Sequence, residues 1–338
     1  MSANLSIANL ADFVRNAEIL WLKGADQFPA AMRRSGLVRE VSIPQNSGNT
    51  REFSDIDLEQ YARVKNEREQ SQYAKVQQGY SKTGTLYRIS FAEEITYEMR
   101  TQGKYPEITA KLTNLLPTAM NRMELDLQHR IGFGGSTTYT DMDGRTIDIA
   151  VGDTLALYST VHTVRGSATT FRNRLANSPQ LSRGALEAME KMRVENHINQ
   201  FGQKVPVMDD LLWTTDDPNT VNTARELLKA TASVDSGINA GVPNVYQGKY
   251  RHVMLPRVAT DKDGNVDSTK AKYWGTASSR ECSLYLGVHE EPHVTPPSTG
   301  GNQDDALTGS WVFLTHAGYM IVVPSANWIG VSYGDGTA

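Results

Sequence analysis

The sequence predicts an α+β protein, and three stretches carry that prediction. Residues 106–131 place apolar side chains at steps of three and four, which is the spacing of one face of an α-helix. Residues 85–99 (TLYRISFAEEITYEM) alternate between apolar and polar, as a half-buried strand does. Residues 310–324 (SWVFLTHAGYMIVVP) form an apolar run that favours a buried strand.

The composition bounds the possible functions. The 338 residues are 39% apolar and 21% charged, which is typical of a globular protein with one large or two smaller domains. The net charge of −4, without a long basic run, argues against tight non-specific binding to nucleic acid. Cys282 is the only cysteine, so an intrachain disulfide and a cysteine zinc site are both excluded. Neither a membrane span nor a secretory leader is predicted, and we expect synthesis in the cytoplasm.

The first hundred residues predict projecting parts. Residues 1–24 have the pattern of an amphipathic helix, and residues 28–53 have too few apolar side chains for a core of their own. We interpret this segment as an arm that lies across another surface. Residues 54–100 predict a long hairpin whose tip lies near the turn-rich hexapeptide 79–84 (GYSKTG). The alternative for its first limb is a partly helical segment, because its residues have helical propensity. Residues 51–104 carry nine basic and nine acidic side chains, and a hairpin of this kind needs a partner surface.

The helix over residues 106–131 has clear end signals. Pro106 fits the first turn, where a missing N–H costs nothing, and Gly132 favours the end of the helix. Pro117 lies inside the pattern. Because the apolar stripe continues beyond it, we expect this proline to bend the helix rather than stop it.

The remaining elements follow from local signals. Asp143-Gly144 predicts a hairpin turn, Ser182 can cap a helix over 182–198, and Asp217-Pro218 can start another. Strands are expected within 205–213, 250–259 and 283–291, and residues 294–309 form a long loop.

Motifs that could carry chemistry are weak. Residues 289–293 (HEEPH) match H-E-x-x-H formally, but Pro292 disfavours the helix that a zinc protease needs, and a polar strand end is expected. The sequence DKDGN at 261–265 has its glycine misplaced for a calcium loop and favours a turn. His162 and His197 are isolated and favour structural roles. We therefore expect no enzyme, no cofactor, and no catalytic, cofactor-binding or metal-binding residues.

The order of these elements resembles the major capsid proteins of tailed bacteriophages, and in particular their Mu-like branch. The segments that carry the resemblance are FAEEITYEMRTQGKYPEI, RMELDLQHRIGFGGSTT, LALYSTVHTVRG, VPVMDDLLWTTDDPNTVNTARELLKA, PNVYQGKYRHVMLPRVA and THAGYMIVVPSANWIGV. Each segment is degenerate by itself, and the specificity lies in their order along nearly the whole chain.

The resemblance implies a division of the chain. Residues 1–53 would be the N-terminal arm, 54–101 the extended loop hairpin, and 102–175 part of the peripheral domain, with the spine helix at 106–131. Residues 176–285 would be the axial domain, and 286–338 would complete the peripheral domain with C-terminal strands. The hairpin tip would contact an adjacent subunit through Tyr80, Ser81, Lys82, Thr83 and Gly84. Asn302 would lie near a three-fold axis. Some relatives cross-link a lysine to an asparagine at such places, which here would be Lys82 and Asn302.

The implied function is a structural head protein that self-assembles, through hexamers and pentamers, into an icosahedral or prolate shell around double-stranded DNA, without binding it specifically. Its partners would be a separate scaffolding protein, a portal and a possible decoration protein, with no membrane; its location would be the virion, after assembly in the host cytoplasm. Two alternatives remain: the shell protein of a bacterial nanocompartment with the same fold, and a metal-dependent hydrolase that uses the HEEPH segment.

Overall fold

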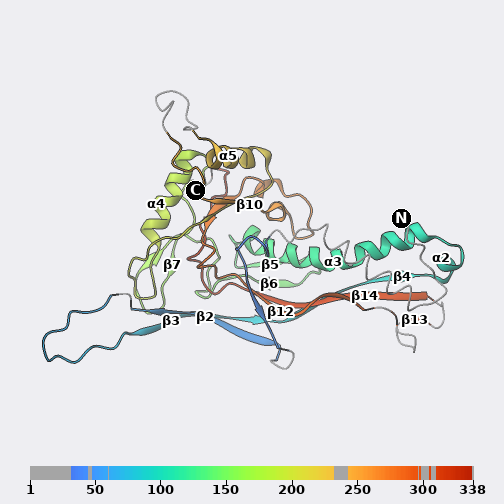
Figure 1. Ribbon diagram of the computed structural model, residues 1–338, viewed down its shortest axis with the longest axis horizontal. Coiled ribbons are helices and arrows are strands. Elements are labelled where there is room, and N and C mark those ends of the chain that lie inside the picture. The colour runs from blue at the N-terminus through green and yellow to red at the C-terminus, as the bar shows by residue number, and fades with distance from the viewer. Residues whose placement is uncertain are drawn as a thin grey trace.

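The computed structural model describes residues 32–44, 48–59, 61–231, 243–295, 297, 304–305 and 310–336. The helix expected over residues 1–24 and the expected contact residue Asn302 lie outside these ranges. The molecule is elongated (Figure 1): a long helix lies over an extended sheet on the right, a second module stands above the left half, and a hairpin runs out at the far left.

The long helix is α3, Tyr105–Gly132, which confirms the prediction over 106–131. It has Pro106 in its first turn and continues through Pro117, as expected from the uninterrupted apolar stripe. Its buried apolar side chains are Ile108, Leu112, Leu115, Ala119, Met123, Leu127 and Ile131. Leu115 is deeply buried, whereas its neighbour Leu116 is only partly buried.

A five-stranded sheet lies beneath α3 within the described residues. Its strands are β1 (Arg39–Ser42), β12 (Tyr285–Thr295), β14 (Ser310–Val322), β13 (Asp304–Asp305) and β4 (Tyr87–Ile95). Strand β4 pairs antiparallel with β14, from Tyr87 opposite Tyr319 to Ile95 opposite Trp311. Apolar side chains of this sheet, such as Phe313 and Ile95, pack against Ile108 and its neighbours on α3. The strand predicted at 85–99 is therefore confirmed over Tyr87–Ile95, whereas residues 97–99 lie in a short helix. The strand pairs with β14 and is not a limb of the hairpin predicted over 54–100.

The arm lies on the chain's own body where it is described. Met32 and Leu37 are fully buried in the main core, and β1 pairs parallel with β12. The backbone N–H of Met32 donates to Glu124 Oε1 on α3 at 2.6 Å. This part of the arm therefore behaves as an edge strand of the sheet rather than as a projecting segment.

The second module contains a three-stranded sheet in the order β10-β9-β11 and two helices, within the described residues. Its elements are α4 (Arg183–Asn196), β9 (Leu211–Thr214), α5 (Pro218–Lys229), β10 (Arg251–Met254) and β11 (Trp274–Ala277). Ser182 and Asp217 cap α4 and α5 through the backbone N–H groups of Ala185 and Thr220, as their sequences predict. All four residues of β9 are buried, so the predicted interior strand is confirmed.

Residues near the C-terminus close this second module. Trp274 and Ser332 exchange two backbone hydrogen bonds, with N···O distances of 3.0 and 2.9 Å. Ala277 also bridges Ile329, and Gly330 N–H donates to Thr276 O at 2.8 Å. Strand β11 thus has β9 on one side and the segment around 328–332 on the other.

The remaining elements are short. They are α2 (Tyr97–Thr101), the hairpin β5 (Thr138–Thr140) and β6 (Thr146–Asp148), the pair β7 (His162–Thr163) and β8 (Thr170–Phe171), and two 3-10 turns, η1 (Pro256–Ala259) and η2 (Ser268–Lys270). Asp141 Oδ1 accepts the N–H groups of Asp143 and Arg145, which confirms the turn at Asp143-Gly144. Among the described helices, none has the length and apolar character needed to cross a membrane.

Candidate subunit-contact site

The projecting hairpin consists of β2 (Thr50–Leu58) and β3 (Val76–Thr85). Their antiparallel register runs from Thr50 opposite Thr85 to Leu58 opposite Val76. Residues 59–75 therefore form the distal loop of the hairpin. The chain reverses near Asn66, where Glu69 N–H donates to Asn66 O at 3.2 Å and Arg68 adopts a φ of 65°. The prediction of a tip at residues 79–84 is wrong, because these residues belong to β3, close to the body.

The distal loop carries large side chains that nothing in the described chain covers. Val64 is 93% exposed and Tyr73 is 89% exposed, and Tyr61 is also exposed. The distal loop thus presents apolar side chains to its surroundings, where another surface could cover them.

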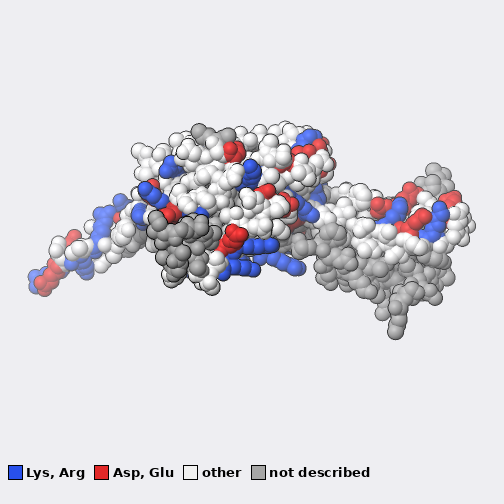
Figure 2. All heavy atoms as spheres, turned by 90° about the horizontal axis from the view of Figure 1, so that it is seen from above, with Lys and Arg blue, Asp and Glu red and all other residues white. Residues whose placement is uncertain are grey.

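Charges of both signs accompany these side chains. The loop has four basic residues (Arg63, Lys65, Arg68, Lys75) and three acidic ones (Glu59, Glu67, Glu69). Figure 2 shows both signs along the projecting end at the left. A salt bridge joins Arg63 to Glu59 at 3.2 Å, within the loop itself. Charges of both signs on the loop could pair with complementary charges on another surface and so fix how the two surfaces align.

The base of the hairpin is different, because it is tied to the body. Tyr80 Oη and Thr163 Oγ1 lie 3.0 Å apart, and Lys82 forms an ion pair with Asp148. Arg165 Nη1 donates to Gly79 O at 3.0 Å. The contacts of Tyr80 and Lys82 that are described are thus within one chain. Subunit contacts through residues 80–84 stay a prediction. The position of these residues at the base of the hairpin no longer supports it.

Gly84 is required by close packing. A Cβ at this position would overlap Cγ2 of Val322 and lie 2.9 Å from Sδ of Met320. Nearby, the rings of Phe53 on β2 and Tyr285 on β12 stack with centroids 4.9 Å apart. The glycine therefore lets β3 lie directly on the end of β14, and does not form a turn.

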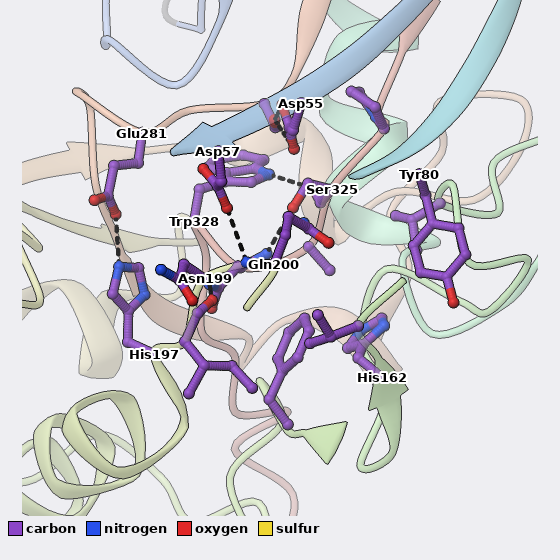
Figure 3. A pocket seen from close by; sticks show the side chains of 18 of the residues that line it. Asp55, Asp57, Tyr80, His162, His197, Asn199, Gln200, Glu281, Ser325 and Trp328 are labelled. Atoms are coloured by element: carbon purple, nitrogen blue, oxygen red, sulfur yellow. Dashed lines mark hydrogen bonds and ion pairs between the residues drawn. The ribbon is translucent and has the colours of Figure 1, made fainter. Parts of the chain in front are cut away.

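A pocket of about 370 Å³ lies where the hairpin base meets the second module. Figure 3 shows Asp55 and Asp57 entering it from β2, Tyr80 from β3, and Gln200 from the segment after α4. Gln200 N–H donates to Asp57 Oδ2 at 2.9 Å, and Ser283 Oγ donates to Asp55 Oδ1 at 3.3 Å. These polar contacts fix the direction in which the hairpin leaves the body.

Asp55 is a carboxylate in this pocket whose pKa is raised. Burial raises its pKa above the ordinary value, and the negative charge of Asp57 adds to the effect. Hydrogen bonds from Ser325 and Ser283 oppose the shift without cancelling it. The hairpin base therefore holds a carboxylate that is costly to ionise.

The two isolated histidines line the same pocket. His162 is fully buried, and its Nδ1 lies 2.8 Å from Asp153 Oδ2. His197 Nε2 lies 3.1 Å from Glu281 Oε2. His162 is thus hydrogen-bonded to a carboxylate, as expected of a structural residue. His197 lies beside a carboxylate, but its Nδ1 and Glu281 Oε2 have no hydrogen-bond partner among the described residues, so a hydrogen-bonded structural role for His197 stays a prediction.

The HEEPH segment lies in strand β12 and not in a helix, so the expected strand end is confirmed. The helical geometry of a zinc protease motif is therefore absent at residues 289–293. The DKDGN segment is a turn in which Asp261 Oδ1 accepts the N–H groups of Asp263 and Asn265, again as expected.

Comparison with known proteins gives structural likenesses only. No protein-family model and no curated protein matches the chain. A structure from Gordonia phage Cozz has a TM-score of 0.49 at 13% identity, covering 89% of this chain and 85% of that one. The asymmetric unit of the bacteriophage PhiM1 mature capsid has a TM-score of 0.48 at 10% identity, covering 88% and 85%.

A virus-like particle from Pyrococcus furiosus has a TM-score of 0.47 at 10% identity, covering 94% of this chain and 98% of that one. At this level the likenesses assign neither a partner nor an assembly to the chain. The α+β class is confirmed by the described helices and sheets. The described elements also follow the order expected of the phage capsid fold: arm strand, long hairpin, long helix, inserted module and closing strand.

Proposed function

We propose that the chain is a shell-forming structural protein, namely the major capsid (head) protein of a tailed phage. The observation that carries this proposal is the distal loop 59–75, which projects from a body that is well packed without it. Leaving Val64 and Tyr73 exposed has no benefit for an isolated subunit. The same side chains become useful when they are buried on a neighbouring copy.

Repetition of one such contact builds a closed assembly. The hairpin and the surface that receives it are different patches, so the contact is heterologous, and rotation from copy to copy closes it into rings. Pentamers and hexamers of this kind would form an icosahedral or prolate shell. Mixed charges on the loop would set its register, while each exposed ion pair contributes little free energy.

In this proposal the five-stranded sheet and α3 form the peripheral domain and residues 176–285 form most of the axial domain. The net charge of −4 suits a container for DNA that does not grip it. A separate scaffolding protein, a portal and a possible decoration protein complete the head, which is assembled in the host cytoplasm. The segment LALYSTVHTVRG favours the Mu-like branch of the family.

The decisive experiment shortens the distal loop and leaves the base intact. Residues 60–74 are replaced by Asn-Gly, which favours a tight hairpin turn. We expect the circular dichroism spectrum and the melting temperature of the subunit to stay unchanged, because the removed segment does not contact the body. Closed particles should be lost in negative-stain electron microscopy and size-exclusion chromatography, with a scaffolding protein present if the parent chain needs one.

Normal particles from the shortened chain would contradict the proposal. So would a parent protein that stays monomeric and whose distal loop resists protease. The nanocompartment alternative predicts the same loss of particles, and the contents of the parent particles separate the two: double-stranded DNA supports the phage head, whereas an enclosed enzyme supports the compartment.

A further inference from the structure

Two histidines and a glutamate meet on one face of the long sheet, away from the hairpin. His293 on β12 and His316 on β14 are direct partners in the antiparallel register. Val294, next to His293, and Phe313, three positions before His316, both pack in the cluster beneath α3. Side chains an odd number of positions apart in a strand point to opposite faces, so the two histidines lie on the other face of the sheet. Irregularities in β12 on either side of Glu290 bring this residue to the same place.

The distances between the three side chains match those of a metal site. Nε2 of His316 lies 3.3 Å from Glu290 Oε1, and Nε2 of His293 lies 3.7 Å from the same oxygen. All three possible ligand atoms lie within 4.8 Å of one another. Ligands of a tetrahedral Zn²⁺ ion, at about 2.0–2.2 Å from the metal, are ~3.3–3.5 Å apart. Small side-chain rotations would therefore complete the geometry.

A hydrogen bond orients the ring of His293 for coordination. Nδ1 of His293 lies 3.0 Å from the carbonyl oxygen of Glu291. A carbonyl can only accept, so Nδ1 carries the proton and donates it. In the neutral ring, Nε2 then presents its lone pair toward Glu290 and His316. Metal-binding histidines in proteins are held in the same way, by a second N–H bond to a carbonyl or carboxylate.

The second ring nitrogen of His316 could still form a hydrogen bond. Its Nδ1 is buried and has no hydrogen-bond partner among the residues that the structure describes. The rings of His293 and His316 lie with centroids 3.9 Å apart at an interplanar angle of 68°. His293 remains 45% exposed, so an ion can enter from solvent and a water molecule can take a fourth position.

One nearby charge opposes a cation. Arg88 Nη2 lies 3.5 Å from Oε2 of Glu290. The arginine side chain is 65% exposed, so solvent screens its repulsion of an ion on the other carboxylate oxygen. Oε2 of Glu290 has no hydrogen-bond partner among the described residues, while Oε1 faces the two histidines.

We propose that Glu290, His293 and His316 bind one divalent transition-metal ion of the Zn²⁺ class, which clamps β12 to β14. Two imidazoles and one carboxylate favour Zn²⁺ and similar ions over Mg²⁺ and Ca²⁺, which prefer all-oxygen sites. The clamp lies two residues before the end of β12 at Thr295. Its role is structural and is independent of whether the chain forms shells.

The test uses tag-free protein that has been stripped with a chelator and dialysed. Mass-spectrometric metal analysis after equilibration with Zn²⁺ should give about one ion per chain. Co²⁺ should give visible absorption bands of a low-symmetry site, which Zn²⁺ displaces and excess Mg²⁺ does not. The melting temperature should rise on addition of Zn²⁺.

The variants His316→Gln and Glu290→Gln should each weaken Zn²⁺ binding by at least the ~10–100-fold that loss of an outer hydrogen-bond partner costs in such sites. His252→Gln is the matched control, because His252 bonds Thr214 and lies outside the cluster. Absence of stoichiometric Zn²⁺ in the parent protein would overturn the proposal, and so would unchanged affinity in either folded cluster variant. Glu290→Gln keeps the size of the side chain, so the test holds even if His316→Gln fails to fold.

Discussion

The two ends of the β2–β3 hairpin have opposite surroundings. At the base, Tyr80 and Lys82 contact Thr163 and Asp148 of the body, and Gly84 allows β3 to touch β14. In the distal loop, Val64 and Tyr73 have almost no cover. The contrast teaches that one element can serve two purposes. Its base belongs to the fold of the subunit, and its distal loop is available to another molecule.

The largest effect on the subunit is expected from Gly84→Val at the base. The added side chain would collide with Val322 and Met320, so the hairpin would have to shift away from β14. We expect a loss of about 1–3 kcal/mol in the free energy of unfolding, measured by urea denaturation.

Gly184→Val is the matched control, because Gly184 lies in α4 with open space around its Cα. It should change the free energy of unfolding by less than about 0.5 kcal/mol. Equal effects of the two substitutions would show that the base is not packed as described.

A smaller effect is expected from Asp55→Asn, also at the base. The pKa of Asp55 is raised in the folded chain, mainly by burial, so the folded state holds its proton more tightly than the unfolded state does. Ionisation of Asp55 therefore costs stability, and this cost appears as the pH rises through the folded-state pKa and is absent below the unfolded-state pKa. Asparagine is uncharged, and its one carbonyl oxygen can still accept the hydrogen bond from Ser283.

The variant should therefore melt at a higher temperature than the parent at neutral pH. The difference should shrink as the pH falls below the unfolded-state pKa of about 3.9, where the parent carboxyl becomes protonated in both states. Melting curves measured over this range test the prediction, with Asp263→Asn on an exposed turn as control. A gain that does not depend on pH would assign the effect to something other than the charge of Asp55.

The smallest effect on stability is expected in the distal loop. Val64→Ser and Tyr73→Ser should change the free energy of unfolding by less than about 0.5 kcal/mol each, because these side chains contact little of the folded chain. Particle yield should nevertheless fall, as quantified by sedimentation or electron microscopy.

Val266→Ser is a matched control for this pair, because Val266 is 89% exposed on a different turn. A fall in yield for Val266→Ser, and none for the loop variants, would move the contact site away from the hairpin.

The contrast between base and loop was only partly visible in the sequence. Helix α3 was predicted to within a residue at each end, because its apolar period, Pro106 and Gly132 agree. The hairpin tip was misplaced because Gly79 and Gly84 were read as turn residues. The chain in fact reverses near Arg68, a non-glycine residue with positive φ that leaves no such signal. Glycines that permit close packing look the same in a sequence as glycines that permit a turn.

The His293–His316 pair could not be predicted for a related reason. The sequence shows HEEPH as a local motif, but the third ligand comes from another strand, and its position depends on the register of β12 against β14. Irregularities in β12 set that register, and single-sequence patterns do not reveal them.

The two backbone hydrogen bonds between Trp274 and Ser332 also bear on folding during synthesis. Strand β11 lacks one of its two neighbours until the ribosome has made and extruded the chain as far as Ser332. In a nascent chain that ends before Ser332, the sheet of the second module is incomplete, whether or not α3 has formed. The order of synthesis therefore makes the C-terminal segment the last part needed to complete this sheet.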